Sequence, residues 1–302
     1  MEQKKVVGFL IAVFLVLSVL FLSLYRSEEI SKTTLSDDFI EGAVENLSSS
    51  DIRIEESVIV RDIPDDDIYY FDNSDTEGNN ERIIKAVIDT VYDNENVTTT
   101  RFDTPAGVSV GIYSGDDDSA ELGRIVFSDN DFSFRYSKKG VSVSGADLPV
   151  FGFDEETASA EEQNVVDRIC RALAEKEHNS YRISGVGGDE NYKIVTAFKT
   201  IEKKDITDVY LNFVFENGTL VAATGSWFTY TPKAKYHESL TDGVNVLYKL
   251  NFADIKSVDG ERTVYRLKKS TDNNCYLVPA WEISYTDKND NARKAYFDAL
   301  EK

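Results

Sequence analysis

Residues 209–222 read Val-Tyr-Leu-Asn-Phe-Val-Phe-Glu-Asn-Gly-Thr-Leu-Val-Ala, and they carry the clearest fold signal in the chain. Apolar side chains alternate along the first half of this stretch and again along the second half. Asn217 and Gly218 lie between the two halves, and Asn-Gly favours a two-residue turn because both residues tolerate positive φ. The stretch therefore predicts a β-hairpin in which Asn217 and Gly218 are the structural turn.

Helical patterns precede the runs of strands. Apolar residues recur every three to four positions in Asn80–Tyr92, in Ala160–Ala174 and at about Leu240–Leu250. The first core positions of the three patterns lie 82 and 79 residues apart, and they are Ile83, Val165 and Val244. This spacing predicts a repeated helix-then-sheet unit. The sequence leaves true duplication and coincidence equally open.

Further strands surround these helices. We expect a strand at Val108–Ile112, a hairpin from Arg124 to Tyr136 that turns at Asp129–Asp131, and a closing hairpin at the C-terminus. The closing hairpin turns at Asp287–Asn291, and the first of its strands has on one face Leu277, Pro279, Trp281, Ile283 and Tyr285. We expect Pro279 and Trp281 to be structural. Runs of strands after single helices indicate an α+β fold, in which antiparallel sheets pack with helices.

The segment before the first repeat predicts one more helix and one more strand. Ser36 is a suitable N-cap, and a helix follows to about Leu47. Its expected apolar face is Phe39, Ile40, Ala43, Val44 and Leu47. Alternation from Ile52 to Val60 is typical of a strand.

An uncharged stretch near the N-terminus predicts a membrane anchor. Val6–Leu24 contains no charged residue over 19 positions. As a helix it would be about 28 Å long, against about 30 Å for the hydrocarbon core of a bilayer. Leu24, Tyr25 and Arg26 do not resemble a small-residue cleavage site, so we interpret the stretch as an uncleaved transmembrane helix.

Charges on either side of the anchor give its direction. Lys4 and Lys5 precede it, whereas Arg26 is soon followed by Glu28 and Glu29. The lysine excess predicts a single-pass protein of the cell membrane with a cytoplasmic N-terminus and an extracellular bulk. We expect a tail, anchor and juxtamembrane segment at 1–27 and two extracellular α+β domains at 28–153 and 154–302.

Small residues follow one stripe of the anchor. Gly8 and Ala12 lie one turn apart, and Ser23 falls on the same stripe. Such a stripe allows a partner helix to approach closely. Chance smallness in an apolar run is the competing interpretation.

The formal net charge of −21 argues against some partners. Nucleic acid and anionic lipid surfaces would repel the outer part, so the anchor is the expected contact with the bilayer. Hydrophobic residues make up 41% and aromatic residues 12%, which is enough for a folded core. Cys170 and Cys275 form no CxxC pair, and the sequence is compatible with one disulfide or with two buried thiols.

No motif in the chain predicts catalysis, a cofactor or a metal site. The only two histidines, His178 and His237, lie in no nucleophile or metal motif. The glycine-rich stretch 184–188 lacks the lysine of a phosphate loop, and we interpret it as a turn between strands. Ala292 replaces the glycine that a calcium loop needs after Asp287, so a turn is the better interpretation there. We therefore expect a protein that is not an enzyme.

The C-terminal hairpin resembles a known family. Tyr276-Leu-Val-Pro-Ala-Trp-Glu-Ile-Ser-Tyr285, followed by Lys294-Ala-Tyr-Phe-Asp-Ala-Leu300, is similar to the closing hairpin of the YycH/YycI family and of PepSY-type domains. The similarity extends upstream to Phe215–Leu220, but the family's usual glycine after the last strand is absent here.

The resemblance implies a function. It implies a non-enzymatic accessory protein of Gram-positive bacteria that adjusts a sensor histidine kinase of cell-wall homeostasis, through its membrane helix and its outer domain. A homologous accessory protein would be a second partner. The alternative is an extracytoplasmic binding domain for a peptide, a protease or a cell-wall component.

The topology is open to a direct test. We expect protease added to intact protoplasts to remove the chain after Ser27 and to spare only the anchor, because the lysine excess places the bulk of the chain outside. Immunoblotting with tags at either end measures this. A large protected fragment would show that the direction is wrong.

Overall fold

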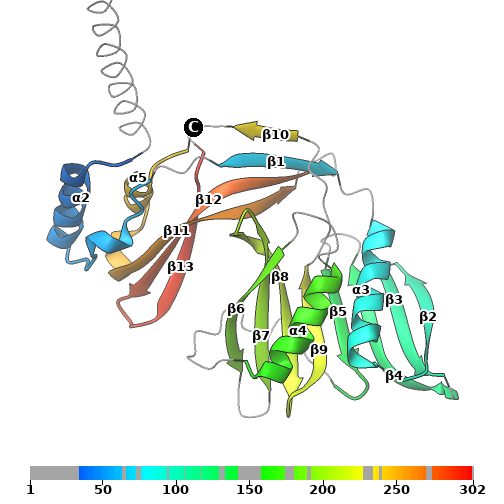
Figure 1. The fold of residues 1–302 in the computed structure, drawn as a ribbon. Coiled ribbons are helices and arrows are strands. Elements are labelled where there is room, and N and C mark those ends of the chain that lie inside the picture. The colour runs from blue at the N-terminus through cyan, green and yellow to red at the C-terminus, as the bar shows by residue number, and fades with distance from the viewer. Residues whose placement is uncertain are drawn as a thin grey trace, which may run out of the picture. The chain divides into compact units, whose positions relative to one another are not determined.

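The computed structural model shows a mixed α+β fold dominated by antiparallel strands (Figure 1). It describes residues 34–62, 66–72, 76–93, 95–105, 107–115, 117–128, 133–141, 158–173, 180–188, 192–226, 234–237, 240–269 and 274–300. The chain forms two compact units. Unit 1 takes its described residues from 1–67, 237–263 and 279–302, and unit 2 takes them from 68–236 and 264–278. This division differs from the expected boundary at residue 153, because the two units are built from interleaved segments.

Unit 2 contains the expected helix-then-sheet arrangement twice. Helix α3 (Thr76–Val91) precedes β2 (Val97–Thr104), β3 (Gly107–Ser114), β4 (Asp117–Ser128) and β5 (Ser133–Lys138). Helix α4 (Ala160–Leu173) precedes β6 (Ser180–Gly188), β7 (Lys193–Ile201), β8 (Lys204–Glu216) and β9 (Thr219–Ser226). Each set of four strands is an antiparallel meander, and the last strands of the two sets, β5 and β9, pair with each other.

The turn of the β8–β9 hairpin is the one expected from the sequence. Asn217 has φ 50° and Gly218 has φ 77°, and the flanking residues Glu216 and Thr219 are paired. Positive φ at both turn positions matches the right-handed twist of the strands, and asparagine and glycine adopt it with little strain. The hairpin from Arg124 to Tyr136 is also confirmed by β4 and β5, while its turn lies outside the described residues.

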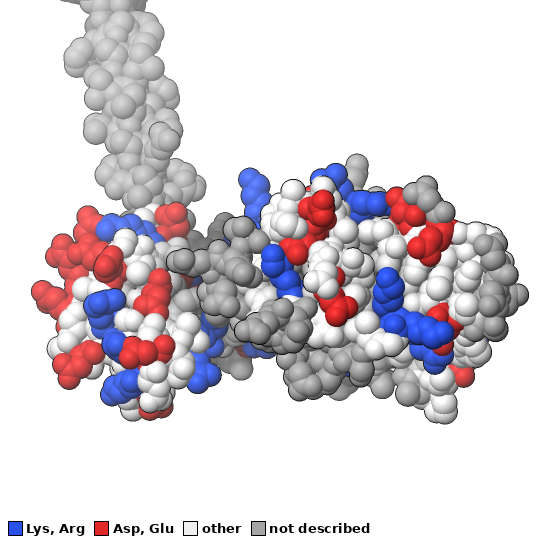
Figure 2. All heavy atoms as spheres, turned by 90° about the horizontal axis from the view of Figure 1, so that it is seen from below, with Lys and Arg blue, Asp and Glu red and all other residues white. Residues whose placement is uncertain are grey.

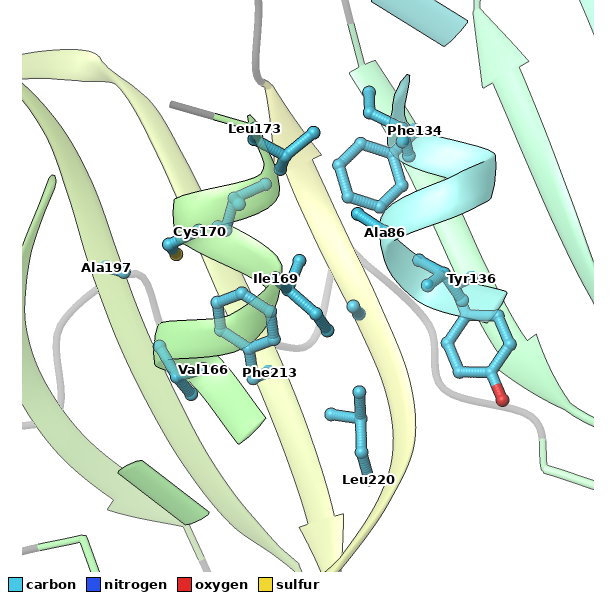
Figure 3. Close-up of a cluster of buried hydrophobic side chains, with 14 of the residues drawn as sticks. Ala86, Phe134, Tyr136, Val166, Ile169, Cys170, Leu173, Ala197, Phe213 and Leu220 are labelled. Atoms are coloured by element: carbon cyan, nitrogen blue, oxygen red, sulfur yellow. The ribbon is translucent and has the colours of Figure 1, made fainter. Parts of the chain in front are cut away.

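Helices α3 and α4 lie side by side on one face of this sheet (Figure 1). Figure 3 shows Val166, Ile169, Cys170 and Leu173 of α4 above the strands, and Ala86 of α3 with Phe134 and Tyr136. The side chains in this cluster are almost fully removed from water. Burial of each large apolar side chain contributes about 1.5 to 3 kcal/mol. The expected core position Ile83 is buried, whereas Val165 is half-buried and its neighbour Val166 takes the central place.

Four more strands contribute residues to unit 2. β1 (Asp67–Asp72) pairs antiparallel with β12 (Asn274–Asp287), while β11 (Ile255–Lys269) pairs in parallel with β8 at Tyr265 and Ile206. The short strand β10 (Ala234–His237) lies beside β1. Cys275 lies in the small core under these strands and Cys170 in the core of α4, and both are buried free thiols.

Unit 1 encloses a separate core around Trp281. Helix α2 (Asp37–Ser49), the 3-10 turns η1 (Glu56–Val58) and η2 (Phe252–Asp254) and the short helix α5 (Gly243–Leu247) accompany the hairpin of β12 and β13 (Ala292–Asp298). Trp281 is fully buried, and its indole Nε1 donates to the carbonyl of Thr241 at 2.8 Å. Pro279 is also buried, and its carbonyl accepts from the amide of Ala299 at 3.1 Å. Both residues are therefore structural, as expected.

Three local expectations were wrong. Residues 52–60 are not a strand: Arg53 forms an isolated β-bridge with Ser257, and η1 follows. The apolar residues alternate here because the isoleucines of this segment are buried in the core. The glycine-rich stretch 184–188 lies inside β6 instead of forming a turn. The helix expected at Leu240–Leu250 is confined to α5, five residues long.

A buried carboxylate lies under α5. Glu261 Oε2 accepts from the amide of Val60 at 2.7 Å, whereas Oε1 has no hydrogen-bond partner. A side chain at Gly243 would overlap this carboxylate and displace it, so glycine allows the close approach of α5 to Glu261. Burial raises the pKa of Glu261 to about 7, and the nearby charge of Asp242 acts in the same direction.

Trp281→Ala should lower the unfolding free energy of the chain from residue 28 onward by about 3 to 5 kcal/mol, because a large buried ring is lost. Trp281→Phe is the matched control, since it keeps most of the apolar volume and removes only the donor to Thr241. It should cost about 1 to 3 kcal/mol. Urea titration measures both, and an alanine effect below about 1 kcal/mol would contradict the buried position.

Glu261 should make the stability of the protein depend on pH. Since its pKa in the fold, about 7, lies above the ordinary value of 4.5, the folded state holds the proton more tightly than the unfolded chain. The contribution of this group is thus most favourable below about pH 4.5 and decreases as the pH rises to about 7, by on the order of 3 kcal/mol. In Glu261→Gln this decrease should vanish. Equal pH profiles of the two proteins in urea titrations would contradict the assignment.

Candidate interaction surface

An exposed group of side chains lies on one flank of α2. Phe39 is 44% exposed, and Asn46 follows it two turns later on the same flank. Asn46 Nδ2 donates to the hydroxyl oxygen of Tyr248 at 3.4 Å, and Tyr248 is 41% exposed. The ring of Tyr248 meets the half-buried ring of Phe252 edge-on, with centroids 6.4 Å apart. We call Phe39, Gly42, Asn46, Tyr248 and Phe252 the aromatic surface.

The local sequence explains how this flank is presented. Ser36 caps α2 by accepting from the amide of Phe39 at 3.4 Å, which fixes the helix start as expected. The adjoining stripe of α2 is buried through Ile40, Ala43 and Leu47. Phe39 was expected on that apolar face and is not part of it, because it lies at the border of the buried stripe and points outward.

The short helix α5 contributes the other side of the surface. Asp242 caps it by accepting from the amide of Asn245 at 2.9 Å. Val244 and Leu247 are fully buried, whereas Tyr248, the C-cap residue of α5, is exposed. The expected core position Val244 is thereby confirmed.

Gly42 leaves a gap between the aromatic side chains. No atom would lie within 4 Å of a side-chain carbon built at this position, so packing against other described residues does not require glycine here. Glycine in a helix interior costs about 0.5 to 1 kcal/mol relative to alanine. A missing side chain between Phe39 and Asn46 lets another molecule approach the helix backbone closely.

The segment that contains α2 is strongly acidic. Residues 34–62 contain two arginines and eight carboxylates, for a net charge of −6, and the carboxylates are Asp37, Asp38, Glu41, Glu45, Asp51, Glu55, Glu56 and Asp62. Figure 2 shows acidic side chains gathered at the left edge of the molecule, where α2 lies in Figure 1. Arg61 is held by Asp37 and approaches Glu56 at 3.9 Å. A partner with basic and apolar groups is the one that this surface fits.

Glu282 of unit 1 is paired with two cations. Glu282 accepts from Arg262 Nε at 2.8 Å and from Lys294 Nζ at 3.0 Å. Burial opposes ionisation of Glu282, yet these two cations hold its pKa below the ordinary value. Such groups stabilise the hairpin and are not available to a ligand.

Asp287 holds the turn between β12 and β13. Its carboxylate accepts from the amides of Asn291 and Asn289, at 2.9 and 2.8 Å, and the Asn291 amide is the main cause of its pKa of about 2. The interpretation as a strand-to-strand turn is confirmed. The described residues contain no group of three side chains suited to hold a metal ion.

Sequence reasoning overlooked several notable positions. Tyr248 and Gly42 were not singled out, although an exposed aromatic after a buried helix and a glycine inside a helix are signals that can be read. Lys199 is fully buried in β7, where burial first and the charge of Arg82 second lower its pKa well below the usual range. In the sequence, the burial of Lys199 is indicated only by its position in an apolar run.

The expected partner-helix residues cannot be placed. Gly8, Ala12 and Ser23 lie outside the described residues, as does His178, and His237 ends β10. Within the described part of the chain, no helix has the length and apolarity to span a bilayer. The anchor at Val6–Leu24 falls outside that part, so it stays a prediction.

Comparisons with known proteins find similarity in solved structures. No family model matches the chain, and no curated protein matches it. An uncharacterised protein from Eubacterium rectale ATCC 33656 is 11% identical, with a TM-score of 0.49, over 79% of this chain and 84% of that chain. The C-terminal domain of YpeB from Bacillus megaterium is 13% identical, with a TM-score of 0.37, over 73% of this chain and 92% of that one. Membership of the YycH/YycI family therefore stays a prediction.

Proposed function

We propose that this chain is a membrane-anchored extracellular regulatory protein that acts by binding and not by catalysis. The observation that carries the proposal is the aromatic surface, where Phe39, which belongs to the strongly acidic segment 34–62, and Tyr248 are both exposed. Exposed aromatic side chains are costly to leave in water and are enriched where proteins bind one another. An acidic rim adds selectivity for a basic partner.

The sequence position of this surface supports a partner in the same membrane. Twelve residues separate Leu24, the end of the expected anchor, from Asp37, the start of α2. A chain of this length spans at most about 45 Å. The aromatic surface would thus remain close to the bilayer, where the outer part of another membrane protein is within reach.

The partner that we propose is a sensor histidine kinase of cell-wall homeostasis. We infer a kinase from the resemblance of the C-terminal hairpin to the YycH/YycI family. To bind the aromatic surface, the kinase would present apolar groups beside lysine or arginine. The anchor would supply a second contact through Gly8, Ala12 and Ser23. Two weak contacts on one partner strengthen each other because the second forms at high local concentration.

A second candidate function is the capture of a basic extracellular peptide. The net charge of −6 over residues 34–62 favours it, since a cationic peptide with apolar side chains matches the same surface. This function needs no contact between membrane helices. The anchor variants below therefore separate the two candidates.

The test compares full-length variants in host membranes. Glu41→Lys with Glu45→Lys reverses the rim of the aromatic surface, and Gly8→Leu with Ala12→Leu blocks close helix approach. Each pair should weaken association with the kinase by about 1 to 2 kcal/mol, a loss of several-fold or more in co-purified complex. Regulon output should change in parallel, at equal membrane abundance.

Matched controls use changes of the same kind elsewhere. Glu81→Lys with Glu216→Lys reverses two exposed carboxylates of unit 2, and Val7→Leu with Val13→Leu enlarges other faces of the anchor. Both controls should retain the complex. Recovery of equal amounts of kinase with all variants would overturn the proposal. A changed regulon output with the rim variant alone, at unchanged kinase recovery, would favour the peptide-binding function.

A further inference from the structure

Strand β2 lies at the end of the sheet of unit 2. In the described strands it pairs with β3 alone, and its residues after Val97 are exposed. Successive side chains point to opposite faces. Phe102, 43% exposed, lies on the face turned away from the helices, and Arg101 and Asp103 lie on the other face.

We propose that β2 pairs antiparallel with β2 of a second copy of this chain, with Phe102 opposite Phe102 of the second copy. An exposed edge of eight residues rich in threonine is a ready template for another strand. Charge complementarity favours a second copy of this chain as the partner of the strand. This inference does not depend on the proposed function.

The register follows from symmetry and charge. Two identical antiparallel strands in one sheet must centre on a single residue, because opposite residues point to the same face. A centre at Arg101 would set two arginines opposite each other, which is unfavourable. A centre at Phe102 sets Arg101 opposite Asp103 of the second copy twice, once on each side of the axis.

Apolar side chains favour the same centre. Val126 of β4 is 46% exposed on the face that carries Phe102, and only Ser109 of β3 lies between them in the register. With Phe102 on the axis, the two phenyl rings meet between the two Val126 side chains. A centre at Thr100 would instead place each phenyl ring opposite a threonine.

The charges on β2 would exchange partners in this dimer. Within one copy Arg101 Nε lies 3.1 Å from Asp103 Oδ1, and both side chains are exposed. An exposed pair of this kind contributes about 0 to 1 kcal/mol, so exchanging it for the cross-strand pair costs little. Pro105 follows the strand and cannot donate to a ladder, which limits the pairing to a short segment and opposes open-ended growth.

Cysteine cross-linking in the full chain tests the register. Phe102→Cys would face itself at a Cβ separation of about 5 Å, whereas Thr100→Cys would lie about 13 Å along the strand from its own copy. Oxidation of host cells that express the full chain should give at least tenfold more disulfide-linked dimer with Phe102→Cys than with Thr100→Cys or Thr104→Cys. Cys170 and Cys275 are buried and serve as the background.

Charge reversal tests the recognition. Arg101→Asp in the Phe102→Cys background should abolish the dimer band, and Arg101→Asp with Asp103→Arg should restore it, because the swap recreates both cross-strand pairs. Strongest cross-linking of Thr100→Cys would overturn the register. Absence of any self-linked product, or cross-linking of Phe102→Cys to a different protein alone, would overturn the dimer.

Discussion

The hydrogen bond from Trp281 to the carbonyl of Thr241 is the contact on which the arrangement of unit 1 depends. It joins β12 to the residue directly before Asp242, the N-cap of α5. The closing hairpin thereby fixes where α5 begins, and α5 in turn sets the outward direction of Tyr248. A buried indole that lost this acceptor would leave a polar N–H without a partner, at a cost of about 1 to 3 kcal/mol. The aromatic surface is thus positioned by a residue that takes no part in it.

Unit 2 is organised by a different constraint, namely the pairing of β5 with β9. Each of the two helix-then-sheet repeats in unit 2 has one sheet face covered by a single helix. Because β5 and β9, the last strands of the repeats, pair with each other, α3 and α4 together cover one continuous face. Arg168 of α4 reinforces this arrangement by donating to the carbonyl of Asp89 in α3 at 2.7 Å. The same pairing leaves β2 as an outer strand, which is why the proposed self-association is located there.

Structural features that depend on a few neighbouring residues could be predicted from the sequence. The Asn217-Gly218 turn, the Ser36 cap and the alternating face of Trp281 each depend on local backbone preferences or on a period of two. Long-range packing decided the rest. Residues 52–60 alternate because their isoleucines fill the core of unit 1, yet most of the segment has no strand beside it. Phe39 has the spacing of a core residue but lies at the edge of the buried stripe. The interleaving of the two units has no sequence signal, since it depends on strands far apart in the chain.

The proposed function depends on the aromatic surface of unit 1. Photo-crosslinking from position 248 of the full-length protein in living cells tests it most directly, with the probe at Glu216 as the control. We expect a covalent product between position 248 and the outer part of a membrane sensor kinase, and no such product from position 216. Equal labelling from both positions, or no protein captured from position 248, would contradict it.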